Sequence, residues 1–131
     1  MKLQEILNKE DLFARHLKGE LLDNPEYVLK KINNKIRSLR RIYKNNIGLS
    51  FIEMGDYIGD FLIENGCKQI SALNIMNNLP GIYFTDEKRN FTLRSNLHSD
   101  TLVLFCMTED GEILYSIEMS RHGKAILRKN N

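Results

Sequence analysis

The chain has 131 residues, of which 42% are hydrophobic and 27% charged, and its formal net charge is +2. This length fits one domain that needs no disulfide or metal to hold its core, and the ordinary composition excludes the disordered and low-complexity classes. Residues 1–5 are not followed by the apolar core of a signal peptide, and no apolar run is long enough to cross a bilayer, so we expect a cytoplasmic protein with no membrane partner.

The first part of the chain has the apolar spacing of helices. One helix is expected over residues 2–18, and a second begins at Asn24-Pro25, where an N-cap is followed by a proline that suits the first helical position. Ser50 and Glu53 have the spacing of a capping box, which predicts that a third helix starts there and ends before Gly66.

A short fourth helix is expected over residues 69–78, after which the apolar period changes from helical to two. Antiparallel strands are then expected over residues 82–85, 90–94, 101–107, 113–119 and 124–128. The prediction is an α+β fold in a single domain, residues 1–131. Residues 1–80 would be mainly helical with a winged-helix-like core, and residues 81–131 would form an antiparallel β-meander.

Cys67 and Cys106 are the only cysteines, and Cys106 lies in an apolar run that favours a buried free thiol. Neither these cysteines nor the three histidines have metal-ligand spacing. No serine, cysteine or aspartate lies in a motif that would activate it as a nucleophile. We therefore predict no metal, no cofactor and no catalytic residue, and favour a binding module over an enzyme.

The second predicted helix is unusually basic, with seven cations and no acid between residues 27 and 49. At 100° per residue, five of them are assigned to the face opposite the apolar stripe: Lys30, Arg37, Arg40, Arg41 and Lys44. A line of cations suits a polyanion such as nucleic acid. The third predicted helix carries four acids on one face, so an alternative is that the two helices neutralise each other: Glu53, Asp56, Asp60 and Glu64.

Residues 49–94 contain a small hydroxyl residue opening a helix at Leu49-Ser50, an apolar-glycine pair at Met54-Gly55, and Leu79-Pro80 leading into a hairpin. This pattern resembles the LOTUS domain, also called OST-HTH, a winged helix whose members bind RNA or dock protein partners. The first helix and the strands after Asn96 have no counterpart in that family. The resemblance implies a recognition helix with Lys68 and Asn74 on its outer side, and a wing tip formed by Lys88 and Arg89.

The sequence also allows two other interpretations of the fold and function. Helices followed by a meander loosely resemble the RelE/ParE toxin fold, whose ribonuclease members would place the site at these residues: Tyr115, Arg121, His122, Lys124 and Arg128. The small size and the Asn-, Ile- and Lys-rich composition also fit a phage or mobile-element inhibitor or adaptor, which could pair a partner strand with residues 124–129.

The sequence therefore predicts a non-enzymatic binding module, with nucleic acid, RNA or DNA, as the favoured ligand and a protein partner as the close alternative. The predicted nucleic-acid-binding residues are Lys30, Arg37, Arg40, Arg41, Lys44, Lys68, Asn74, Lys88 and Arg89. The oligomeric state is left open.

Overall fold

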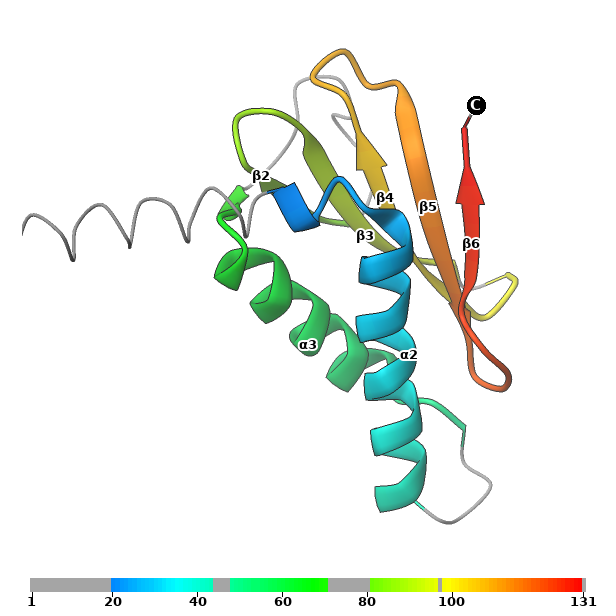
Figure 1. The fold of residues 1–131 in the computed structure, drawn as a ribbon. Coiled ribbons are helices and arrows are strands. Elements are labelled where there is room, and N and C mark those ends of the chain that lie inside the picture. Colours follow the sequence, from blue (N-terminus) through cyan, green and yellow to red (C-terminus); the bar gives the residue numbers. More distant parts are fainter. Residues whose placement is uncertain (1–19, 44–47, 71–80, 97, 131) are drawn as a thin grey trace, which may run out of the picture.

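The computed structural model describes residues 20–43, 48–70, 81–96 and 98–130. Two helices, α2 (Pro25–Ile42) and α3 (Phe51–Glu64), precede the strands (Figure 1). The strands are β1 (Lys68–Ile70), β2 (Ile82–Thr85), β3 (Asn90–Asn96), β4 (Thr101–Met107), β5 (Ile113–Ser120) and β6 (Ile126–Lys129). The prediction of N-terminal helices followed by an antiparallel meander is confirmed.

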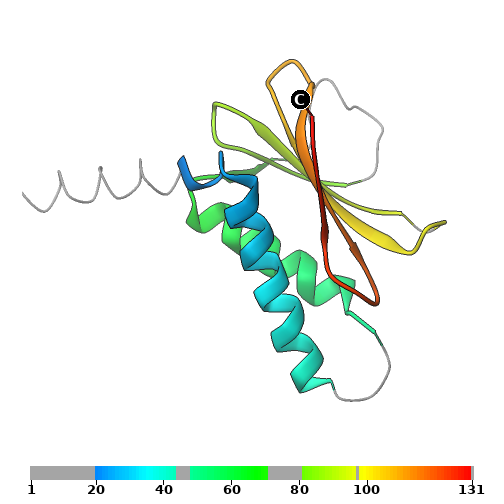
Figure 2. The same cartoon turned by 45° about the vertical axis from the view of Figure 1, so that its right-hand side comes forward.

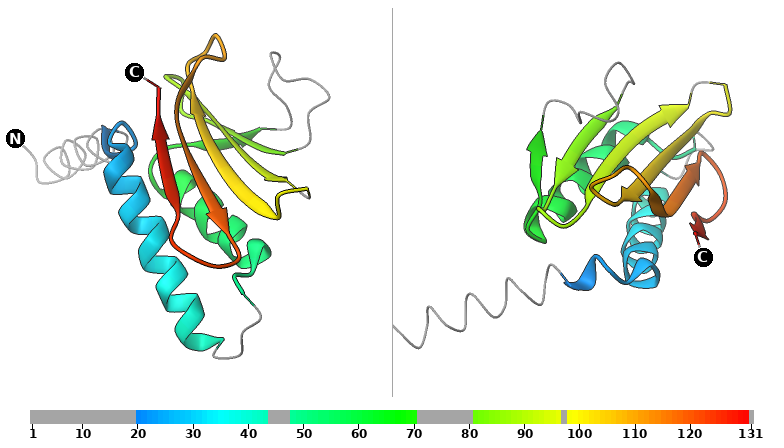
Figure 3. Two further views of the ribbon diagram at one scale, coloured as in Figure 1. Left: turned by 90° about the vertical axis from the view of Figure 1, so that its right-hand side faces the viewer. Right: turned by 90° about the horizontal axis from the view of Figure 1, so that it is seen from above.

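The six strands form one sheet in chain order, and each strand is antiparallel to the next. The strands β1 and β6 are therefore its two edges. Both helices lie on the same face of the sheet, which gives the fold two layers (Figures 2 and 3). Within the helix layer, α3 packs beside β1 and α2 beside β6, so the two helices lie towards opposite edges. Neither described helix is long and apolar enough to cross a bilayer.

The start of α2 is where the sequence predicts it. The Asn24 side chain accepts hydrogen bonds from the backbone N–H groups of Glu26 and Tyr27 at 3.1 and 3.2 Å, and Pro25 occupies the first turn. These contacts satisfy donors that have no partner inside the helix. One arc of the helix is buried, formed by Val28, Ile32, Ile36 and Leu39. The helix is thus fixed by its cap at one end and by this arc along its length.

Only one of the two hydrogen bonds of the predicted capping box of α3 forms. The Ser50 hydroxyl accepts from the backbone N–H of Glu53 at 3.4 Å, as expected of an N-cap. The Glu53 carboxylate, however, accepts the hydroxyl of Tyr43 and does not turn back towards Ser50. The helix ends at Glu64, and Gly66 follows with φ of +99°, a left-handed conformation that glycine adopts at low cost.

Two glycines four residues apart lie on the side of α3 that faces the sheet. A Cβ atom at Gly59 would stand 3.3 Å from the ring of Phe84, and one at Gly55 would stand 3.6 Å from the side chain of Leu93. The contact at Gly59 is tighter than an ordinary one, so a side chain there would require the Phe84 ring to shift, whereas a Cβ at Gly55 would make ordinary van der Waals contact. Gly59 is therefore the position at which the absence of a side chain lets α3 approach β2 closely.

One hydrophobic core joins the helices to the sheet. It takes alternate residues from the central strands, among them Phe91, Leu93, Leu104 and Ile117, which meet the buried arcs of α2 and α3. On the opposite face of the sheet, Tyr83 and Met107 form a second, smaller buried cluster. Five of the seven residues of β4 are buried, whereas Val103 and Phe105, which face away from the helices, are only partly buried.

The loop that enters α3 is tied to the turn between β5 and β6. The backbone N–H of Leu49 donates to the carbonyl of Arg121 at 2.9 Å, and the Arg121 guanidinium donates back to the carbonyl of Leu49 at 2.7 Å. The same guanidinium lies over the ring of Phe51 and pairs with Asp100. This turn therefore holds the first residues of α3 in place.

The prediction that a fourth helix starts at residue 69 is wrong. Gln69 and Ile70 lie in β1, where they pair with Phe84 and Tyr83 of β2. Hydrogen bonding to a strand that follows later in the chain has overridden the local helical pattern. The remainder of that predicted helix and the helix expected over residues 2–18 lie outside the described residues. The hairpin of β2 and β3 forms where it was predicted and continues into β4.

Replacing Ser50 with alanine should lower the free energy of unfolding by about 0.5–2 kcal/mol, because the α3 cap is removed. Chemical denaturation monitored by circular dichroism measures this change. Ser38→Ala is the matched control, since Ser38 is exposed in the middle of α2 and should change stability by no more than about 0.5 kcal/mol. Equal stability of Ser50→Ala and the wild type would contradict the assigned cap.

Candidate nucleic-acid interface

Three cations form a line along the outer side of α2. Lys30, Arg37 and Arg41 are exposed and lie opposite the buried arc, because their spacings of seven and four residues return to one side of a helix. The Arg37 guanidinium also donates to the side chain of Asn34, which lies on the same side. We call these three residues the basic stripe.

Arg40 belongs to the flank of the helix. Its guanidinium donates to the carbonyl of Gly123 at 2.7 Å and to that of Arg121 at 3.4 Å, while the side chain of Asn33 accepts the backbone N–H of Ala125 at 3.0 Å. The turn between β5 and β6 is therefore held against α2, and exposed Lys124 lies within it. Arg40 was predicted as a ligand-binding cation, and its Nη2 group is engaged by the turn.

The other flank of α2 faces α3 and carries two lysines. The Lys31 ammonium lies 5.5 Å from the ring centre of Tyr27, and that of Lys35 lies 5.4 Å from the ring centre of Tyr57, which belongs to α3. Both distances are within the range of cation–π attraction. These lysines thus meet aromatic rings and stand apart from the basic stripe.

The acidic residues of α3 do not neutralise the basic stripe. Asp56, Asp60 and Glu64 are exposed, and in the described residues none of them forms an ion pair with a cation of α2. The only ion pair that a residue of α2 makes within those ranges joins Glu26 to Lys129 of β6. The alternative in which the two helices neutralise each other is therefore not what the contacts show.

The remaining predicted cations lie elsewhere. Lys68 is exposed in β1, at the sheet edge opposite to β6, and Lys88 is exposed in the hairpin between β2 and β3. The nine predicted residues therefore do not form a single surface around a recognition helix. Lys44 and Asn74 lie outside the part of the chain that the structure describes.

Arg89 was predicted at an exposed wing tip, and this expectation is wrong because the residue is only 3% exposed. Its guanidinium lies 3.0 Å from the Asp86 carboxylate, contacts Asp23, and stands 6.0 Å from the ring centre of Phe91. Asp23 immediately precedes the Asn24 cap of α2, so Arg89 fastens the β2–β3 hairpin to the helix layer. The local sequence carries no signal for this, since Asp23 is 66 positions away.

Arg89→Leu should lower the free energy of unfolding by about 3 kcal/mol, because it leaves the largely buried Asp86 carboxylate without its cation. Urea denaturation measures the difference. Lys88→Leu changes the neighbouring exposed residue and should cost less than about 0.5 kcal/mol. A decrease below about 1 kcal/mol for Arg89→Leu would mean that the pair remains hydrated.

The five residues considered for ribonuclease chemistry are not all brought together, because only Arg121, His122 and Lys124 share the turn between β5 and β6. Tyr115 is buried beneath the helices and donates to the carbonyl of Leu22 at 2.9 Å, and burial raises its pKa. Arg128 is paired with Glu118 at 2.7 Å on the opposite face of the sheet. Arg121 is held by Asp100 and Leu49, and His122 is exposed in the turn.

Both cysteines are buried free thiols, as was predicted for Cys106. Burial is the largest cause that raises the pKa of each thiol to about 12. Almost no thiolate, the reactive form of cysteine, is then present at neutral pH.

Cys67 and Cys106 should accordingly resist a thiol reagent such as dithionitrobenzoate at pH 8 in the folded protein. Two equivalents should react once the protein is unfolded in guanidinium chloride. Rapid reaction of one thiol under native conditions would show that its surroundings open to solvent.

The described residues contain no group of His, Cys, Asp and Glu side chains that could hold a metal ion. No family model matches the chain, and no curated protein or solved structure shows significant similarity to it.

Proposed function

We propose that the chain is a nucleic-acid-binding module that holds a phosphate backbone along the basic stripe of α2. The observation that carries this proposal is that Lys30, Arg37 and Arg41 are exposed and unpaired with any carboxylate in the described part of the chain, although the neighbouring helix is acidic. Exposed cations without a carboxylate partner can exchange their counterions for phosphates, which favours binding.

The spacing of the basic stripe suits successive phosphates. From Lys30 to Arg41 the helix rises by about 16 Å at 1.5 Å per residue, which is about the length of five nucleotides of one strand. Arg37 and Arg41 can each offer two parallel N–H donors to a phosphate, a geometry that lysine cannot match. The stripe thus offers positioning contacts with the backbone and no reading of base sequence.

The negative charge of α3 favours one side from which a phosphate backbone can approach α2. Its exposed carboxylates repel phosphates on the α3 side of α2. On the other side, Arg40 holds the β5–β6 turn against the helix and exposed Lys124 extends the positive surface. A strand bound to the basic stripe would therefore lie towards β6. Lys124 was considered from the sequence only for ribonuclease chemistry, and the folded turn is what places it beside α2.

The test is binding of fluorescently labelled RNA, single-stranded DNA and duplex DNA of mixed sequence, measured by anisotropy over a range of salt concentrations. The double variant Arg37→Gln/Arg41→Gln should bind more weakly to every sequence. For each phosphate that is no longer neutralised, the slope of log affinity against log salt should fall by about 0.9 for duplex DNA or about 0.7 for a single strand. Thermal unfolding should change little because both side chains are exposed.

The matched control is Lys68→Gln/Lys88→Gln, which removes the same charge from exposed residues away from the stripe. It should leave the salt slope close to that of the wild type. Two results contradict the proposal: no binding by the wild type at low salt, or an equal decrease in affinity in both double variants, which would reflect net charge alone.

A further inference from the structure

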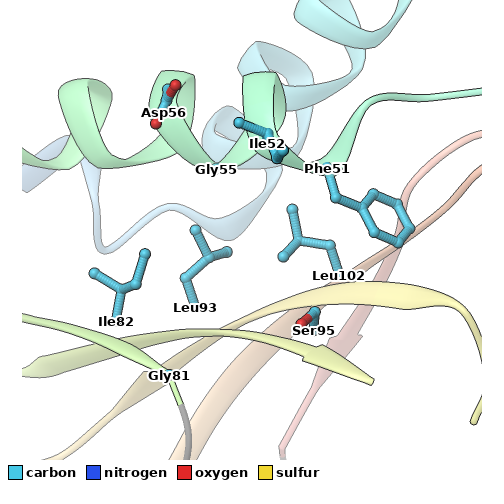
Figure 4. Close-up of a pocket in the computed structure, with 9 residues that line it drawn as sticks. All are labelled: Phe51, Ile52, Gly55, Asp56, Gly81, Ile82, Leu93, Ser95 and Leu102. Carbon is cyan, nitrogen blue, oxygen red and sulfur yellow. The ribbon is translucent and has the colours of Figure 1, made fainter. Parts of the chain in front are cut away.

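A cleft of about 440 Å³ lies between the first two turns of α3 and the sheet (Figure 4). Ile82, Leu93 and Leu102 project into it from β2, β3 and β4, and Gly55 leaves the facing side of the helix without a side chain. This volume is within the range of roughly 300–1,000 Å³ that ligand pockets occupy. The cleft is thus a mainly apolar hollow at the edge of the helix layer.

The rim of the cleft carries apolar side chains that the described residues leave in contact with solvent. Ile52 is 80% exposed and Ile82 is 44% exposed, and Ile63 lies further along the same side of α3 with 49% exposure. A single isoleucine on a helix surface is common, but here two isoleucines flank a cleft. Covering this surface would remove apolar area from water and so favour association.

The same side of α3 is acidic. Asp56 is the only charged side chain among the described residues that line the cleft, and it has no cation partner within the described ranges. Asp60, one turn later, lies towards α2, where it lines a second hollow together with Lys31 and Tyr57. A phosphate backbone would be repelled here, whereas a cationic ligand with an apolar part would match both the charge and the hollow.

We propose that this cleft is the docking site for a basic amphipathic segment of a partner protein. An apolar side chain of that segment would enter the cleft between Ile52 and Ile82, and flanking Lys or Arg residues would lie beside Asp56. The cleft opens to solvent beside exposed Ile52 and Ile82, which suits a peptide segment better than an enclosed small molecule. The proposal does not depend on nucleic-acid binding, because it uses a different helix and the opposite charge.

The probe is a synthetic helical peptide with leucines at positions i and i+4 and lysine or arginine at most other positions. A second peptide carries glutamate in place of every cation. Titration of ¹⁵N-labelled protein should show that the basic peptide perturbs the backbone amides of residues 51–56 and of Ile82, while those of the basic stripe on α2 are unchanged. The acidic peptide should produce no such perturbation.

Three variants test the contacts. Ile52→Ser should weaken binding about tenfold or more by removing an apolar contact, and Asp56→Lys should weaken it by up to about fivefold for each ion pair removed. Gly55→Leu should fill the cleft and block the peptide, because its Cβ would stand at an ordinary contact distance of 3.6 Å from Leu93. Asp110→Lys, an exposed change in the turn between β4 and β5, is the matched control and should bind like the wild type.

The proposal is overturned if the basic peptide does not bind, if both peptides bind equally, or if Ile52→Ser and Gly55→Leu bind as tightly as the wild type. It is also overturned if the wild type self-associates in analytical ultracentrifugation and Ile52→Ser abolishes that association, since the occupant would then be a second copy of the chain. Nucleic-acid binding by Ile52→Ser should match that of the wild type, so failure of this proposal is distinguishable from failure of the other.

Discussion

The buried arc of α2, formed by Val28, Ile32, Ile36 and Leu39, is the contact on which the arrangement of charges depends. A helix with one apolar arc can cover a sheet in only one rotation about its own axis, because any other rotation exposes that arc to water. Once the arc is buried, Lys30, Arg37 and Arg41 must face solvent. Arg40 and Asn33 then lie on the flank beside the β5–β6 turn, and Lys31 and Lys35 lie on the flank beside α3.

The same constraint acts on α3, and together the two helices divide the surface by charge. The buried residues of α3 turn its carboxylates outward, while Gly59 permits a close approach to the sheet. The helix layer consequently carries a positive surface towards β6 and a negative one towards β1. A net charge of +2 hides this separation, because the two groups nearly cancel in the sum. Two ligands of opposite charge could be held at once without competing.

The local signals in the sequence predict the local structure well. Asn24-Pro25 and Ser50 mark the helix starts because each cap involves residues that are two or three positions apart. The change of apolar period locates the strands for a similar reason. Sequence reasoning fails where distant residues decide the outcome. Gln69 joins β1 because β2 is available to pair with it, and Arg89 is buried because Asp23 lies beside it in the fold.

The candidate sites also differ in whether nearby or distant residues in the sequence form them. The exposed side of α2 could be predicted because it is the complement of an apolar stripe, although grouping Arg40 with Arg41 ignored the angle of about 100° that separates neighbouring residues on a helix. The cleft beside α3 could not be predicted, since its walls come from three strands as well as a helix. Its one local signal is the glycine pair at positions 55 and 59, which leaves one side of α3 without side chains.

The peptide group of Arg121 accepts from both Leu49 and Arg40, so the turn near the end of the described chain joins the end of one helix to the start of the next. During synthesis the helices leave the ribosome before any strand of this hairpin exists. The contacts that fasten both helices to this turn must then wait for residues more than 70 positions apart to meet. Such long-range closure slows folding. We therefore expect a nascent chain arrested before residue 121 to hold two helices that have not yet acquired their final packing.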